Sequence, residues 1–156
     1  MKEHHPNIRR IDVESAEEMY EEARRAYTDA DAGILCAAVA DFTPDHTADH
    51  KIKRGKDGMT IQLKPTKDIA ASLGATKKEG QVLVGFALET NDEQQNAKGK
   101  LERKNFDFIV LNSLNDKGAG FRVDTNKISI IDRQDTTSYP LKNKSEVAKD
   151  IIDRLV

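Results

Sequence analysis

Three runs of hydrophobic residues, each of six to eight positions, stand out along the chain. They cover 33–40 (GILCAAVA), 81–87 (QVLVGFA) and 106–111 (FDFIVL). Runs of this length and character are typical of strands that are covered on both faces, as the strands of parallel sheets are. Weaker strand patterns occupy 8–13 and 59–63. Two further short segments, 128–131 and 138–141, are predicted to pair as a hairpin across a polar turn.

Between these runs the hydrophobic positions recur at helical spacing. Ser15 opens a capping box with Glu18, and the residues that follow place one apolar face on a helix that ends near Thr28. A short helix is predicted from a Thr66 cap to Gly74. A second capping box, 90–93 (TNDE), opens a helix that reaches about Lys104, and a last helix covers about 145–155.

Strands that alternate with helices are the signature of βαβ units. The pattern therefore predicts an α/β fold in one domain over 1–156: a three-layer, Rossmann-like, mainly parallel sheet with an antiparallel hairpin or arm extension. Its crossovers are expected to be right-handed. In such sheets, ligands bind beyond the carboxyl ends of the strands.

Composition and charge narrow the class of protein. The 25 basic and 27 acidic residues give a net charge of −2, which argues against a nucleic-acid partner that depends on phosphate contacts. The longest uncharged apolar run has eight residues, too few to span a membrane, and the N-terminus has no signal-peptide core. The single Cys36 excludes an internal disulfide. These features predict a cytoplasmic protein.

Two basic clusters are candidate sites for an anionic ligand. Lys51, Lys53 and Arg54 lie in a polar loop that could close over a phosphate, although the pattern alone favours a solvated charged loop. Lys100 and Lys104 are one helical turn apart, so both ammonium groups leave the same face, where an oligophosphate could lie between them. The pattern alone favours a solvated lysine-rich face.

Other candidates have simpler explanations. His46 and His50 have the spacing of metal ligands on a helix, but their segment is not convincingly helical, so metal binding there is a weak alternative. Cys36 reads as a small core residue rather than a nucleophile. The chain has neither of the common glycine-rich phosphate-binding motifs. The residues alone thus predict an α/β domain with an anion site, and no reaction.

Several segments, in order and at matching distances, resemble one known family. They are 36–42 (CAAVADF), 51–54 (KIKR), 84–90 (VGFALET), Lys100 with Lys104, and 106–112 (FDFIVLN). Together they resemble the phosphopantothenate–cysteine ligase domain, the C-terminal half of the bifunctional phosphopantothenoylcysteine synthetase/decarboxylase of coenzyme A biosynthesis. The resemblance implies a two-step reaction in which CTP, with Mg²⁺, activates 4′-phosphopantothenate as an acyl-cytidylate before cysteine displaces CMP.

The same resemblance implies a role for ten residues. Lys51 would be catalytic, on a mobile flap. The remaining nine would bind the nucleotide: Cys36, Ala37, Ala38, Asp41, Asp68, Ile69, Phe86, Lys100 and Lys104. No residue is expected to bind a resident metal. Lys67 departs from the family pattern, which has proline there, and Arg54 replaces a lysine.

The family's glycine-rich first βα unit has no counterpart in this sequence. We therefore expect a C-terminal portion of the ligase domain, weakly active or inactive alone, with FMN confined to a decarboxylase half that is absent. The resemblance also implies a homodimer, with Met59 to Leu63 in an interface arm. The alternative is a non-catalytic nucleotide-binding or dimerisation module.

Overall fold

A computed structural model describes residues 5–54, 58–89, 92–113 and 123–155 of the chain. The main sheet has the strand order β1-β4-β5-β7-β8, in which β1, β4 and β5 run parallel and β7 and β8 are antiparallel. The five strands are Ala32–Leu35 (β1), Val82–Glu89 (β4), Phe108–Ser113 (β5), Ile128–Asp132 (β7) and Thr136–Ser138 (β8). The predicted mainly parallel sheet with an antiparallel hairpin is confirmed.

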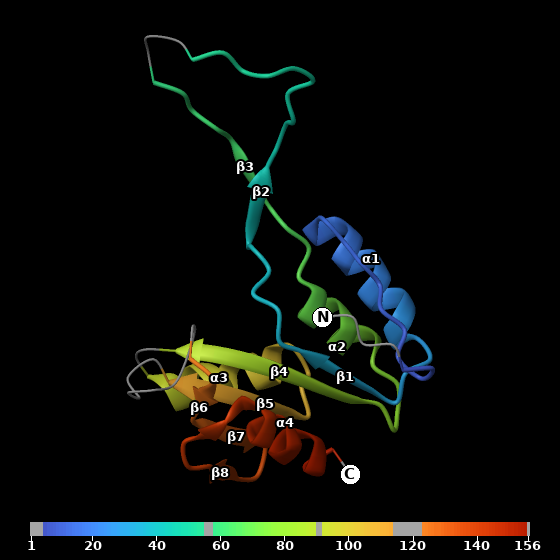
Figure 1. Ribbon diagram of the computed structural model, residues 1–156, viewed down its shortest axis with the longest axis vertical. Coiled ribbons are helices and arrows are strands. Elements are labelled where there is room, and N and C mark those ends of the chain that lie inside the picture. Colours follow the sequence, from blue (N-terminus) through green and yellow to red (C-terminus); the bar gives the residue numbers. More distant parts are fainter. Residues whose placement is uncertain (1–4, 55–57, 90–91, 114–122, 156) are drawn as a thin grey trace.

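Helices cover both faces of this sheet (Figure 1). The helices Ala16–Tyr27 (α1), Ile69–Thr76 (α2) and Glu93–Arg103 (α3) pack on one apolar cluster, whose centre includes Leu83, Leu101 and Ile109. The helix Lys144–Asp153 (α4) covers the other cluster, with Val84 and Val110 at its centre. The molecule therefore has the three layers that the sequence predicts.

Two small antiparallel pairs complete the fold. Thr125–Asn126 (β6) pairs with Lys142–Asn143 (β9) beside α4. Phe42–Pro44 (β2) pairs with Leu63–Pro65 (β3) at the base of a long arm that projects away from the body, toward the top of Figure 1. We call residues 42–54 and 58–65 the arm. None of the helices in the described ranges is long and apolar enough to cross a membrane.

The helix starts follow local chemistry. Ser15 and Glu18 form the predicted capping box of α1. At α2 the prediction was wrong by two residues, because Asp68 accepts the amide of Ala71 at 3.0 Å, whereas the Thr66 hydroxyl donates to the carbonyl of Ala40 at 2.6 Å. The 90–93 capping box falls partly outside the described residues, and Asp92 caps α3 without a side-chain hydrogen bond.

Four strand predictions need correction. The second strand of the hairpin is Thr136–Ser138 rather than the predicted 138–141. Residues 8–13 form no strand, and Ile8 and Ile11 are exposed, because the alternating pattern finds no partner strand in the described chain. The predicted strand 59–63 is replaced by β3, which begins only at Leu63. The run 33–40 is a strand only to Leu35, at the edge of the sheet rather than in its centre.

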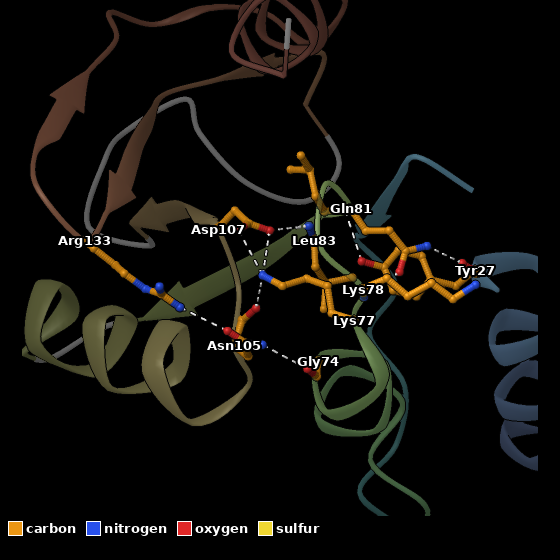
Figure 2. Close-up of polar contacts among 10 residues, drawn as sticks. Tyr27, Gly74, Lys77, Lys78, Gln81, Leu83, Asn105, Asp107 and Arg133 are labelled. Carbon is orange, nitrogen blue, oxygen red and sulfur yellow. Dashed lines mark hydrogen bonds and ion pairs between the residues drawn. The ribbon is translucent and has the colours of Figure 1, made fainter. Parts of the chain in front are cut away.

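A polar network joins the amino ends of the parallel strands (Figure 2). The side chain of Lys77 is only 11% exposed, and its ammonium donates to both carboxylate oxygens of Asp107 at 2.9 Å and to the carbonyl of Asn105 at 2.8 Å. Asp107 in turn accepts the backbone amide of Leu83 at 2.6 Å. The Gln81 amide donates to the carbonyls of Tyr27 and Ala30, which ties the end of α1 to β4.

Candidate functional site

A cavity of about 660 Å³ opens at the carboxyl end of β1, below the arm. Its walls come from α1, from residues 34–42, from the start of α2, and from the facing sides of β4 and α3. This position matches the rule that ligands bind beyond the carboxyl ends of parallel strands. All residues of the run 36–40 except Ala38 therefore line a cavity rather than the core of a strand.

Most of the predicted binding residues meet in this cavity. Its lining includes Cys36, Ala37, Asp41, Asp68, Ile69, Phe86, Lys100 and Lys104. Ala38 lies in the same segment but is not among the lining residues. Cys36 is exposed at the cavity rather than buried in a strand, which corrects its interpretation as a core residue.

Lys51 does not reach this cavity. It is exposed, as are Lys53 and Arg54, in the segment between β2 and β3, and none of the three is among the lining residues of the cavity. His46 and His50 lie in the same segment of the sequence, and the His46 ring lies 3.3 Å from the Asp45 carboxylate. Among the described residues, no group of three His, Cys, Asp or Glu side chains is placed to hold a metal ion.

The two lysines of α3 form the cationic wall of the cavity. Lys100 is in the last turn of the helix and Lys104 is its C-cap residue, whose amide donates to the carbonyl of Lys100. Asn105 follows with a φ of 50°, a left-handed conformation that ends the helix and that asparagine tolerates. This ending fixes the position from which Lys104 reaches the cavity.

Each lysine has a carboxylate partner from another element. The Lys100 ammonium lies 2.6 Å from Glu89, at the end of β4, and the Lys104 ammonium lies 3.2 Å from Asp68, at the start of α2. Sequence reasoning missed Glu89 as a site residue. The signal was its position at the carboxyl end of a buried strand.

Asp68 serves two elements at once. One carboxylate oxygen caps α2 through the amide of Ala71, and the other pairs with Lys104. Burial alone would raise the pKa of Asp68, but the amide of Ala71 and the ammonium of Lys104 outweigh burial and hold that pKa below its ordinary value. Asp68 is therefore a carboxylate whenever the pair is formed.

The rim of the cavity is fixed by Thr66 and Lys67. Besides the Thr66 hydroxyl bond to Ala40, the Thr66 amide donates to the carbonyl of Asp41 at 2.9 Å. Lys67 pairs with Glu17 of α1, and its ammonium lies 4.6 Å from the centre of the Tyr20 ring. The hydrogen bond with Glu17 is the main reason that the pKa of Lys67 is raised. The rim segment 65–68 is thus tied to α1, to α3 and to residues 40–41.

The remaining walls are largely apolar. Leu35, Val39, Ile69, Phe86 and Phe106 contribute to them. Phe106 packs so closely on Gly85 that a Cβ at position 85 would lie 2.4 Å from its ring. A cavity with two adjacent ammonium groups and an apolar wall suits a ligand that joins a phosphate to a flat or extended organic group.

Comparisons with known proteins agree on a family. The family model described as "DNA/pantothenate metabolism flavoprotein C-terminal domain" matches residues 1–156. A relative named "Cysteine/Cysteine sulfinic acid decarboxylase", from an unknown prokaryotic organism, is 57% identical over 96% of this chain and 42% of its own length. The "Coenzyme A biosynthesis bifunctional protein CoaBC" of Bacillus subtilis (strain 168) is 44% identical over 93% of this chain and 36% of its own length. The chain spans about two-fifths of the curated relatives that it matches.

Solved structures match the fold. The crystal structure of the C-terminal domain of Coenzyme A biosynthesis bifunctional protein CoaBC superposes with a TM-score of 0.74 at 33% identity, covering 93% of this chain and 63% of that one. The DNA/pantothenate metabolism flavoprotein from Streptococcus pneumoniae gives a TM-score of 0.81 at 18% identity, covering 98% of this chain and 74% of that one. The second likeness shows the α/β, Rossmann-like fold alone.

These comparisons correct the functional expectation drawn from the sequence. A relative that is 57% identical is named a decarboxylase, and the matching family is described as a flavoprotein. The assignment as a CTP-dependent phosphopantothenate–cysteine ligase, with CTP and Mg²⁺ at the site, is therefore wrong, and its non-catalytic alternative gains no support. The relatives are named as enzymes of decarboxylation and of coenzyme A biosynthesis. The chain belongs to the DNA/pantothenate metabolism flavoprotein family, of which it matches the C-terminal domain.

Proposed function

We propose that this chain is part of a decarboxylase-type flavoprotein of pantothenate metabolism, and that its cavity binds a phosphate-bearing ligand of that enzyme. The family description and the name of the 57% identical relative support the enzyme class. Decarboxylation is proposed for the whole protein, since the chain covers only about two-fifths of such relatives. The role of this chain is to bind and orient the ligand.

One observation carries the proposal for the ligand. Lys100 and Lys104 present two ammonium groups, one helical turn apart, on the wall of a cavity whose other walls are mainly apolar. Two cations at this spacing can contact different oxygens of one phosphoryl group or of two adjacent ones. The apolar wall, with Phe86 and Phe106, can cover the organic part of the ligand and exclude water from it.

We propose two ligands that share this chemistry, FMN and 4′-phosphopantothenate. The residues fit FMN, since Lys100 and Lys104 would hold its phosphate and the apolar wall its ring. A bound flavin supplies an electron-pair acceptor. The residues that line the cavity also fit 4′-phosphopantothenate, whose extended chain could lie along residues 36–41. Cysteine, named in the 57% identical relative, is proposed as part of the substrate.

Isothermal calorimetry with matched ligand pairs tests this proposal. FMN is compared with riboflavin, and 4′-phosphopantothenate with pantothenate, so that each pair differs only in the phosphate. We expect one phosphorylated member to bind, and Lys100→Ala or Lys104→Ala to weaken it by about tenfold each. Lys98→Ala, an exposed lysine of the same helix outside the cavity, is the control and should change little.

The two pairs distinguish the two sources of the phosphate. Binding of FMN alone identifies a cofactor site, and binding of 4′-phosphopantothenate alone identifies a substrate site. Equal binding of phosphorylated and unphosphorylated members, or no effect of either lysine substitution, would overturn the proposal.

We further propose that the arm pairs with a second copy of this chain. The arm projects from the body and exposes several large apolar side chains: Phe42, Ile52, Met59, Ile61 and Leu63, each 57–62% exposed. Side chains of this kind gathered on one projecting segment are typical of an interaction surface. A homodimer buries them without another partner. The catalytic role expected for Lys51 stays a prediction.

A further inference from the structure

The two cavity lysines are already neutralised by carboxylates. Lys100 pairs with Glu89 and Lys104 with Asp68, so the cationic wall carries two acids as well as two bases. Neither acid comes from the helix that carries the lysines. A phosphate can therefore bind only by sharing or displacing these carboxylates.

The two pairs differ in how tightly they are held. The Glu89 side chain is 15% exposed, lies 2.6 Å from Lys100, and also accepts the Asn96 amide at 3.5 Å. The Asp68 side chain is 50% exposed and lies 3.2 Å from Lys104. Exposed ion pairs contribute little free energy, because water screens them, so the Lys104 pair is the easier one to open.

Displacement depends on the charge of the incoming group. A single carboxylate brings one negative charge, which the side chain of Asp68 or Glu89 already supplies. Replacing that side chain by a monocarboxylate therefore gains no electrostatic free energy. A phosphoryl group at neutral pH carries up to two negative charges and three acceptor oxygens, so it can satisfy an ammonium group better than the side chain it replaces.

We propose that Asp68 and Glu89 are positioning residues that act as a charge filter, admitting phosphoryl groups and rejecting monocarboxylates, with Lys104 released before Lys100. This inference rests on the proposed phosphate site and goes beyond it, since it assigns a selective role to two acids in a site for anions. The ligand-free pairs also hold both lysines at the wall, which lowers the ordering cost of binding.

Charge-neutralising substitutions in the full chain test the filter with inorganic pyrophosphate, inorganic phosphate and acetate as probes. Asp68→Asn keeps the helix cap, because asparagine caps about as well as aspartate. We expect it to tighten pyrophosphate about 2- to 5-fold. Glu89→Gln keeps the shape of the side chain, and we expect about 10-fold tightening together with measurable acetate binding.

Loss of any acid near a polyanion could raise affinity in a general way. Glu102→Gln is the matched control, because Glu102 is an exposed residue of α3 outside the cavity lining. It should shift pyrophosphate affinity by less than about twofold. Equal effects of all three substitutions would overturn the filter.

Double-mutant cycles separate a filter from simple structural support. The gain from Asp68→Asn should vanish in a Lys104→Ala background and persist in a Lys100→Ala background, and the gain from Glu89→Gln should show the opposite dependence. If the two acids only stabilise the fold, both substitutions will lower the denaturation midpoint and weaken the binding of every probe.

The outcomes also separate this inference from the proposed function. If the unmodified chain binds pyrophosphate and neither substitution changes its affinity or its rejection of acetate, the filter is wrong and the phosphate site stands. If only Glu89→Gln binds pyrophosphate, the resident carboxylates exclude phosphoryl groups as well as acetate, and the filter is wrong. If no form of the chain binds a phosphoryl probe, both proposals fail.

Discussion

Lys77 shows how one charged side chain can hold several backbone segments. Its ammonium is nearly buried and donates to Asp107 and to the carbonyl of Asn105, whose own side chain donates to the carbonyl of Gly74 (Figure 2). The end of α2, the end of α3 and the start of β5 thereby meet at one cation. Breaking such a pair leaves a charge without its counter-ion in a place that water reaches poorly.

We predict that Asp107→Asn lowers the free energy of unfolding by about 2 kcal/mol, less than for a fully buried pair because Asp107 is partly exposed. Urea denaturation measures the change. Adding Lys77→Met should restore part of the loss, since it removes the unpaired charge. A change below about 0.5 kcal/mol in Asp107→Asn would show that the pair contributes no more than a surface ion pair.

A second residue-scale prediction concerns pH. The backbone amides of Asp135 and Gln134, and then Arg154, lower the pKa of Asp132 in the β7–β8 turn. A carboxylate with a lowered pKa stabilises the fold above its unfolded-state pKa of about 3.9, and this contribution disappears as the pH falls through the folded-state value. Asp132→Asn should therefore destabilise the protein at pH 7.

The difference between Asp132→Asn and the unmodified chain should shrink as the pH falls below about 4. Thermal denaturation across the range from pH 7 to pH 2 measures it. Asp29→Asn, at an exposed turn after α1, is the control and should show no such convergence. A constant difference at all pH values would contradict the role assigned to the Asp132 carboxylate.

At the scale of elements, the crossing of α2 and the end of α3 depends on one glycine. A Cβ at Gly74 would lie 2.0 Å from the carbonyl oxygen of Lys104, a backbone atom that cannot move aside cheaply. The sequence pattern places Gly74 at the end of its helix, as a stop signal. In the structure it lies inside α2, where it permits the close approach that brings Asp68 and Lys104 to the same cavity.

Gly74→Ala should therefore lower the free energy of unfolding by about 2–3 kcal/mol and also weaken phosphate binding, because Lys104 is displaced. Denaturation and calorimetry measure the two effects. Gly99→Ala is the matched control in α3: its Cβ would meet only the mobile end of Arg103, so a gain of about 0.5–1 kcal/mol is expected. Equal stability of the two variants would contradict the packing argument.

Element types were predictable where the pattern was long and local. The capping box at Ser15 and the runs of β4 and β5 have clear signals, and α1, β4 and β5 form close to their predicted positions. The strand predicted for 33–40 was wrong beyond Leu35, because small apolar residues are as suitable for the wall of a cavity as for a buried strand. Apolarity shows that a residue avoids water, but not whether protein or a ligand covers it.

At the scale of the whole molecule, the contacts within one chain account least well for the stability of the arm. Its paired strands have three residues each, and two short strands alone are marginally stable in water. The sequence predicted an antiparallel arm but placed its strand at 59–63. The pairing register depends on contacts at the base of the arm, which no local pattern encodes.

We predict that the proposed homodimer dissociates when the apolar surface of the arm becomes charged. Met59→Asp with Ile61→Asp should shift sedimentation equilibrium from dimer to monomer without changing the far-ultraviolet circular dichroism of the body. Ile152→Asp, at an exposed apolar residue of α4, is the control and should leave the association unchanged. A monomeric unmodified chain at micromolar concentration would contradict the dimer.

The candidate site was only partly predictable. Lys100 and Lys104 were both predicted on one helix, so their spacing alone predicts that the two side chains leave the same face of that helix. Glu89 and Asp68 join them from positions 11 and 36 residues away, counted from Lys100 and Lys104. Only the folded sheet brings these four charges together, so their pairing could not be deduced from spacing.

The base of the arm and the rim of the cavity are built from the same residues. Phe42 and Pro65 pair in the arm and also line the cavity, and Thr66 joins the two sides of the base. A contact that orders the base of the arm therefore also orders the rim of the cavity, and a ligand that orders the rim also orders the base of the arm. By thermodynamic linkage, if pairing of two arms raises the affinity of the cavity for its ligand by some factor, the ligand strengthens the pairing by that same factor. Association and ligand binding in this protein would then be two measurements of a single coupling free energy.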